Sequence, residues 1–149
     1  MSVDFTIPDE GAFNDAMLAL EGRVTRNTGP ATRAGAEAIL EAIRRNMFGP
    51  LPPKPAGSNP AFRTGNLFDS VRMETLPGAV GIGRWNYEIY VDVDQAPYAR
   101  RIEGGFHGTD SLGRNYNQPP YPFFEPGVTE AVDAGVIENI YYGAWSEAF

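Results

Sequence analysis

The chain has 149 residues, 42% hydrophobic and 21% charged, which is typical of a soluble globular protein and predicts a single domain over residues 1–149. It has no cysteine and one histidine, His107, which excludes disulfides, thiolate metal sites and a cysteine–histidine catalytic pair. The net charge of −7 argues against a surface that grips a phosphate backbone and suits one that DNA slides past. No apolar run approaches a membrane span and no signal-peptide pattern opens the chain, so we expect a cytoplasmic product.

The first predicted elements are two helices separated by Thr-Gly-Pro at 28–30. Apolar residues at spacings of four, three and four predict one helix over residues 9–28, with a stripe made of Phe13, Met17, Leu20 and Val24. A second helix is predicted from about residue 30 to residue 47. Gly29 suits a helix end and Pro30 a helix start. The residues leave open whether Thr-Gly-Pro breaks a longer helix or only kinks it.

Residues 49–62 contain five prolines, from Pro50 to Pro60. Proline fixes φ and removes a backbone donor, so we expect an extended, exposed arm rather than a core element. Loops of this length are uncommon inside compact domains and are often functional.

The next segment changes from helical to strand-like spacing. Thr64 is a candidate N-cap of a short helical turn, and from Val71 onward apolar and polar residues alternate. Pro-Gly at 77–78 predicts a tight turn, and a second alternating run covers 87–93. Helices followed by an antiparallel meander define an α+β fold.

The sequence Ala-Pro-Tyr-Ala-Arg-Arg-Ile-Glu-Gly-Gly at 96–105 predicts a short helix. Asp94 or Gln95 would cap it, Pro97 would lie in its first turn, and Gly104 would end it in a left-handed conformation. We expect inward packing by Tyr98, Ala99 and Ile102. Glu103 lies in the last turn, where a carboxylate opposes the helix dipole. Two interpretations stay open: a solvated acid, or a carboxylate held for a partner.

A glycine-rich loop is predicted over 104–120, followed by one final helix from about Pro126. Its expected buried face consists of Val128, Val132, Val136 and Ile140. Gly135 would weaken this helix by about 1 kcal/mol relative to alanine.

Motifs for catalysis or cofactor binding are weak. The run Gly-Ile-Gly-Arg-Trp-Asn at 81–86 lacks the third glycine of a dinucleotide loop, and no phosphate loop or nucleophile elbow occurs. Glu103 with Asp110 is conceivable as an acid–base pair, and His107 has no visible partner. We therefore predict no catalytic residue, cofactor or metal site, and keep a small hydrolase or a ligand-binding module as alternatives.

Three short motifs follow one another between residues 60 and 130. They consist of Thr64, Gly65, Leu67 and Ser70; then Tyr98, Ala99, Glu103 and Gly105; then Pro120, Pro122 and Phe123. In this order and spacing the chain resembles the tail-completion or head–tail joining proteins of long-tailed bacteriophages. Phe106 departs from the pattern, because the family usually has threonine there.

The resemblance implies a structural virion protein rather than an enzyme: a minor tail component in the virion neck, assembled in the cytoplasm of the bacterial host. Its partners would be further copies in a closed six-fold ring, an adjacent head-completion or neck protein, and a tail terminator or tail tube protein. DNA would cross the lumen without sequence-specific binding. A tail terminator capping the tube is the alternative. Interface candidates, besides the arm at 49–62 and the loop at 104–120, are Arg100, Arg101, Glu103, Phe106, His107 and Tyr116.

Overall fold

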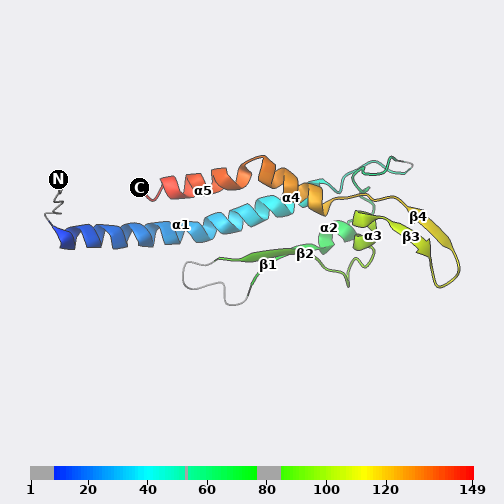
Figure 1. Ribbon diagram of the computed structural model, residues 1–149, viewed down its shortest axis with the longest axis horizontal. Coiled ribbons are helices and arrows are strands. Elements are labelled where there is room, and N and C mark those ends of the chain that lie inside the picture. The colour runs from blue at the N-terminus through cyan, green and yellow to red at the C-terminus, as the bar shows by residue number, and fades with distance from the viewer. Residues whose placement is uncertain (1–8, 53, 77–84) are drawn as a thin grey trace, which may run out of the picture.

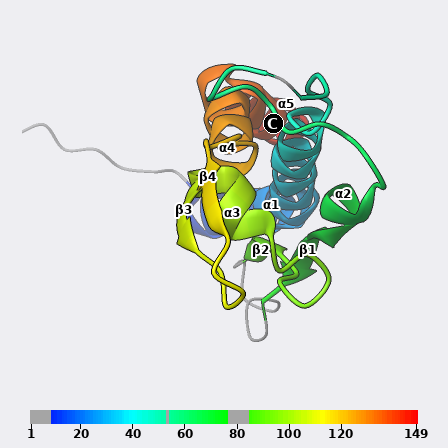
Figure 2. The ribbon, with the colours of Figure 1, turned by 90° about the vertical axis from the view of Figure 1, so that its right-hand side faces the viewer.

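The computed structural model describes residues 9–52, 54–76 and 85–149, and it shows an elongated fold organised around one long helix (Figure 1). The elements are α1 (Glu10–Arg45), α2 (Asn66–Ser70), β1 (Val71–Thr75), β2 (Tyr87–Val91), α3 (Ala99–Gly104), β3 (Phe106–Thr109), β4 (Asn115–Gln118), α4 (Phe124–Asp133) and α5 (Val136–Ser146). Helices α4 and α5 lie on one side of α1, and β1 and β2 lie on the other (Figures 1 and 2). The predicted α+β class is confirmed.

Helix α1 is continuous through Pro30, so of the two alternatives left open for Thr-Gly-Pro, the break into two helices is wrong. Proline leaves one carbonyl without its backbone donor, but tertiary packing compensates. Gly29 is buried against the ring of Trp85, so close that a Cβ on Gly29 would lie 2.6 Å from a ring carbon. Thr28 and Thr32 donate their hydroxyls to the carbonyls one turn earlier, at 2.7 and 2.8 Å. Gly29 therefore allows the close approach of Trp85 and does not end the helix.

The proline-rich segment is a closed loop rather than an extended arm. Gly49 donates its N–H to the carbonyl of Pro60 at 2.8 Å, and the rings of Phe48 and Phe62 stack with centroids 5.0 Å apart. Only glycine fits at 49, because a Cβ would lie 1.9 Å from the carbonyl oxygen of Asn59. The ends of the loop are thus held together within the chain, which the count of prolines alone does not indicate.

Two antiparallel hairpins supply the strands. In the first, β1 pairs antiparallel with β2, as the meander prediction expected, in a register that places Val71 opposite Val91. The predicted turn at 77–78 lies outside the described residues. The second hairpin, β3 with β4, occupies the segment predicted as a glycine-rich loop, so that prediction is wrong.

The C-terminal segment forms two helices instead of one. Gly135, with φ of 65°, adopts the left-handed conformation that ends α4 and starts α5. Val132 and Val136, expected in the core, are exposed at this break. The break turns α5 along α1, where Asn27 Nδ2 donates to the carbonyl of Ala144 at 2.8 Å. The chain end therefore returns beside the middle of α1.

The core lies at the C-terminal end of α1. Its buried members are Ile43, Met47, Val71, Ala96, Ala99 and Phe123. Helix α4 crosses α1 at Gly127, where a Cβ would lie 2.4 Å from the Cα of Ile43. Full burial of each large apolar side chain contributes about 1.5–3 kcal/mol. This cluster therefore holds α1, β1, α3 and α4 together and positions the site described below.

Candidate functional site

The three sequence motifs meet in space at this end of the molecule, and we call their meeting point the motif junction (residues 64–70, 98–105 and 120–123). Asn66, inside the first motif, donates its side-chain amide to the carbonyl of Gln95 at 2.8 Å and to the hydroxyl of Tyr98 at 3.2 Å. Phe123 of the third motif shares the buried core with Ala99 of the second. Segments that are 15 to 30 residues apart in sequence thus form one unit.

The first motif builds the turn that starts α2. Gly65 is the N-cap, with φ of 79°, a conformation that favours glycine. Thr64, predicted as the cap, instead accepts a long hydrogen bond of 3.4 Å from the N–H of Asn66. Ser70 is fully buried and donates its hydroxyl to the carbonyl of Leu67 at 2.7 Å. Each motif residue therefore has a local structural task.

The second motif forms α3 and the sharp exit from it. Ala99 is buried as expected, whereas Tyr98 is exposed because its hydroxyl faces Asn66 at the surface. The residue that leaves the helix in a left-handed conformation is Gly105, with φ of 73°, and not Gly104. A Cβ on Gly105 would lie 2.8 Å from the carbonyl oxygen of Gln118. The glycine thus lets the two ends of the second hairpin cross closely.

The contacts of Glu103 decide between the two interpretations of its position in α3, a solvated acid or a carboxylate held for a partner. One carboxylate oxygen accepts the backbone N–H groups of Phe123 and Phe124 at 2.8 and 3.0 Å, and the other accepts that of Glu125 at 3.0 Å. These groups open α4, where backbone donors lack helical partners and the helix dipole favours negative charge. Glu103 is thus held by a partner within its own chain. It caps a helix that starts at Phe124, 21 residues later.

A sequence signal for this cap exists in hindsight. The N-cap position of α4 is Phe123, which offers no side-chain acceptor. A helix start without serine, threonine, aspartate or asparagine needs an acceptor from elsewhere. Two features of the sequence together indicate this contact: Glu103 is a carboxylate in an unfavourable last turn, and the helix that follows it has no capping side chain of its own.

The second hairpin is organised at its tip by Asp110. Its carboxylate accepts the N–H groups of Leu112 and Arg114, both at 2.9 Å, and pairs with the Arg114 guanidinium at 2.7 Å. Hydrogen bonds from the Arg114 backbone and side chain are the main causes that lower the pKa of Asp110. The tip is therefore a defined turn that presents Leu112, 74% exposed, to the surroundings.

The interface candidates cluster around this hairpin. Arg101 places its guanidinium 4.6 Å from the ring centroid of Phe106, and Tyr116 lies beside the same ring on the partner strand. Arg100 and His107 are exposed. Glu103 is the exception, because both of its oxygens bind α4. Within the candidate segment 104–120, the exposed Leu112 is a further interface residue that the sequence analysis did not name singly.

Features of an active or metal site are weak in the described residues. Glu103 and Asp110 both bind backbone N–H groups of their own chain, and His107 lies on an exposed strand opposite Asn117. Residues 9–52, 54–76 and 85–149 contain no cluster of three or more acidic, histidine or cysteine side chains that could hold a metal ion. Within the same residues, no helix is long and apolar enough to cross a membrane.

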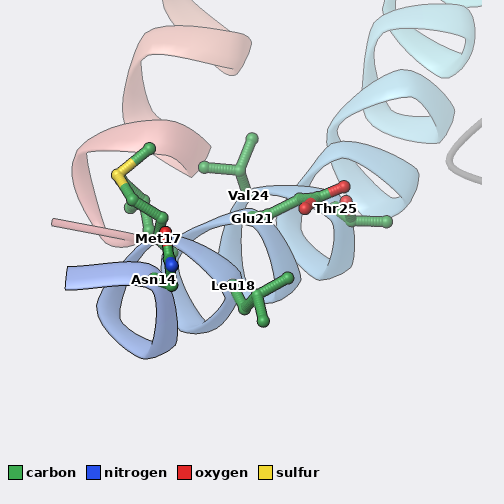
Figure 3. A pocket seen from close by; sticks show the side chains of 7 residues that line it. Asn14, Met17, Leu18, Glu21, Val24 and Thr25 are labelled. Atoms are coloured by element: carbon green, nitrogen blue, oxygen red, sulfur yellow. The ribbon is translucent and has the colours of Figure 1, made fainter. Parts of the chain in front are cut away.

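An exposed apolar surface lies at the opposite end of the molecule. The N-terminal part of α1 extends past the end of α5, and a surface hollow of about 600 Å³ lies against it (Figures 1 and 3). Phe13 and Met17 are 48% and 49% exposed there, and Leu18 is 66% exposed. We call this surface the α1 overhang (residues 10–25).

Comparison of the chain with protein-family models, with curated proteins and with solved structures finds no match.

Proposed function

We propose that the chain is the subunit of a closed ring at the head–tail junction of a long-tailed phage or phage-like particle. The observation that carries the proposal is the motif junction. Three motifs, each unspecific alone, contact one another through Asn66 and Tyr98, through Glu103 and Phe123, and through a shared core.

The surfaces of the molecule suit assembly. Subunits of a closed ring use two different faces, so that each face of one copy meets the complementary face of the next. The α1 overhang and the second hairpin are exposed surfaces at opposite ends of the long axis (Figure 1). Exposed apolar clusters such as Phe13, Met17 and Leu18 of the α1 overhang are typical of interaction sites.

The charge favours passage of DNA over binding. At −7 per copy, a ring carries a strongly negative field, which opposes close approach of the phosphate backbone. In this role the ring seals the joint between a neck protein and the tail and leaves a channel. Catalysis has no part in this function, which consists of docking and closure in the virion.

Electron microscopy of particles made without the chain tests the proposal. We expect filled heads beside detached tails of normal length, because each part completes its own assembly and only the joint is missing. Overlong tails would instead identify a tail terminator. Intact infectious particles would contradict both functions, and complementation with the wild-type gene is the control.

A further inference from the structure

The hollow on the α1 overhang continues the groove in which α5 lies. Helix α5 contacts α1 where Trp145 Nε1 donates to the hydroxyl of Thr28 at 3.2 Å and the Tyr141 hydroxyl donates to that of Thr32 at 2.8 Å. Thr25 lines the hollow three residues before Thr28, so all three threonines lie on one face of α1. Because α1 extends past the end of α5 (Figure 1), the hollow is the same groove without the helix that covers it further along.

The lining of the hollow is mainly apolar. Met17, Leu20 and Val24 belong to the apolar stripe of α1, and they line the hollow together with Leu18 (Figure 3). Glu21 is the one charged residue in the lining. Met17 and Leu18 are 49% and 66% exposed in the part of the chain that the structure describes. The segment that fits such a surface offers apolar side chains on one side.

Residues 1–8 come directly before α1 and have apolar side chains at every second position. The apolar members are Val3, Phe5 and Ile7, and the polar members between them are Ser2, Asp4 and Thr6. Side chains of an extended chain alternate in direction, so the apolar set shares one side and the polar set the other. With the apolar side against α1, Asp4 would face solvent and not Glu21.

The lengths of the segment and of the hollow agree. Eight residues in extended conformation span about 26 Å. Helix α1 rises about 24 Å from Asp9 to Thr25. Alternate side chains of an extended chain are about 6.6 Å apart, and one helical turn rises about 5.4 Å. Successive apolar side chains of residues 1–8 can therefore each meet a successive turn of α1.

The start of α1 directs the chain toward this side of the helix. Asp9 is the N-cap and accepts the N–H of Ala12 at 2.9 Å, which makes Phe13 the fourth helical residue. In a hydrophobic staple, the residue before the N-cap packs against this fourth residue. Pro8 precedes the cap, and Phe13 is 48% exposed. Since Phe13 begins the apolar stripe, a staple with Pro8 brings residues 1–8 to the apolar side of α1.

We propose that residues 1–8 fold back along α1 of their own chain and place Val3, Phe5 and Ile7 in the hollow. The inference goes beyond the proposed function, because it concerns the free subunit. A short segment held by a few apolar side chains opens locally before the rest of a chain unfolds. The segment therefore covers the α1 overhang of the free subunit without adding to its global stability, and a neighbouring copy that docks there displaces it.

Cysteine pairs test this contact, because the full chain has no cysteine of its own. Val3→Cys with Thr25→Cys joins the segment to the lining of the hollow. Val3→Cys with Ala19→Cys is the matched control, because the exposed Ala19 lies two residues from Met17 and thus about 160° around the helix from it. Both partner positions are at similar distances along α1 from the place that Val3 reaches.

The rate of intramolecular disulfide formation is the readout, measured by mass spectrometry after mild oxidation of dilute protein. We expect the Thr25→Cys pair to close at least about fivefold faster than the Ala19→Cys pair, because a bound segment has a high effective concentration at one face only. A segment that is not held against α1 meets both cysteines at similar rates.

A second pair of variants tests the apolar side of the segment. Phe5→Asp adds a charge to the side that contacts the hollow, and Thr6→Asp adds the same charge to the polar side as the matched control. We expect Phe5→Asp to bring the two closure rates within about twofold of each other, since a charge is costly to place against an apolar surface. The control should keep the difference. An unchanged helical signal in circular dichroism shows that each variant folds.

The outcomes separate this inference from the proposed function. Equal closure rates at Thr25 and Ala19 overturn the inference, and so does a preference for Thr25 that survives Phe5→Asp. Disulfides that form only between two molecules also overturn it, since they place the segment on a second copy. The experiment uses dilute subunits and needs no ring, so either result leaves the ring function to its own test.

Discussion

The two ends of α1 have the same spacing of apolar residues, but these residues are exposed at one end and buried at the other. Phe13 and Met17 near its start are half exposed, whereas Ile43 and Met47 at its end are completely buried. The difference lies in what packs against each end: the buried end meets β1, α3 and α4, and the α1 overhang extends past α5 (Figure 1). Periodicity therefore predicts a helix face, while the rest of the fold decides whether that face is core or available for assembly.

The largest effect should come from the buried end. Phe123→Ala removes a fully buried ring from the motif junction and should lower the free energy of unfolding by about 3–5 kcal/mol. Phe13→Ala, a matched change on the α1 overhang, should stay within about 0.5 kcal/mol for the monomer. Urea unfolding followed by circular dichroism measures both. Equal losses would contradict the contrast between the two ends.

The next effect concerns the cap that joins α3 to α4. Glu103→Ala leaves the three N–H groups at the start of α4 without their acceptor and should cost about 1–3 kcal/mol. Glu103→Gln keeps one carbonyl oxygen and should lose less. The midpoint of urea unfolding ranks the two variants. A Glu103→Ala chain as stable as wild type would mean that solvent replaces the cap.

Deleting residues 106–117 should leave the fold intact and block head–tail joining. The deletion brings Gly105 next to Gln118, whose carbonyl oxygen already lies 2.8 Å from where a Cβ on Gly105 would be. Circular dichroism should retain the helical signal of wild type, and electron microscopy should show detached tails. Normal infectious particles from this variant would exclude the hairpin from assembly.

The smallest effect on overall stability concerns the hairpin tip. Because its hydrogen bonds lower the pKa of Asp110, the tip gains stability that is fully present above the ordinary carboxyl pKa of about 3.9. That gain is lost as the pH falls through the lowered value in the folded state. Asp110→Asn should abolish this pH dependence. Amide protection factors of residues 108–116, which correct for the pH dependence of intrinsic exchange, check it between neutral and acidic pH, and equal protection factors at both would contradict the role of Asp110.

Local signals predicted the parts of the fold that depend on neighbouring residues. The alternation from Val71 onward and over 87–93 indicated two strands, and the structure pairs 71–75 with 87–91. The apolar stripe predicted a helix from residue 9, and in the structure Asp9 caps its start by accepting the N–H of Ala12 at 2.9 Å.

Features of the fold that depend on contacts between distant residues were not predicted from the sequence. The burial of Gly29 against Trp85 outweighs the tendency of proline to end a helix, and the left-handed Gly135 splits what the apolar spacing joined. Strands β3 and β4 are polar and exposed on both faces for most of their length, so no alternation marks them. The partner of Glu103 lies twenty residues away, beyond the reach of any helical pattern.

The mass of the purified full chain, measured across a concentration series by native mass spectrometry, tests the central claim most directly. A closed ring predicts one discrete species above the 16.3 kDa monomer, at a fixed multiple of that mass, six by the resemblance. Only 16.3 kDa monomers at every concentration, or an open-ended ladder of sizes, would contradict a ring-forming subunit.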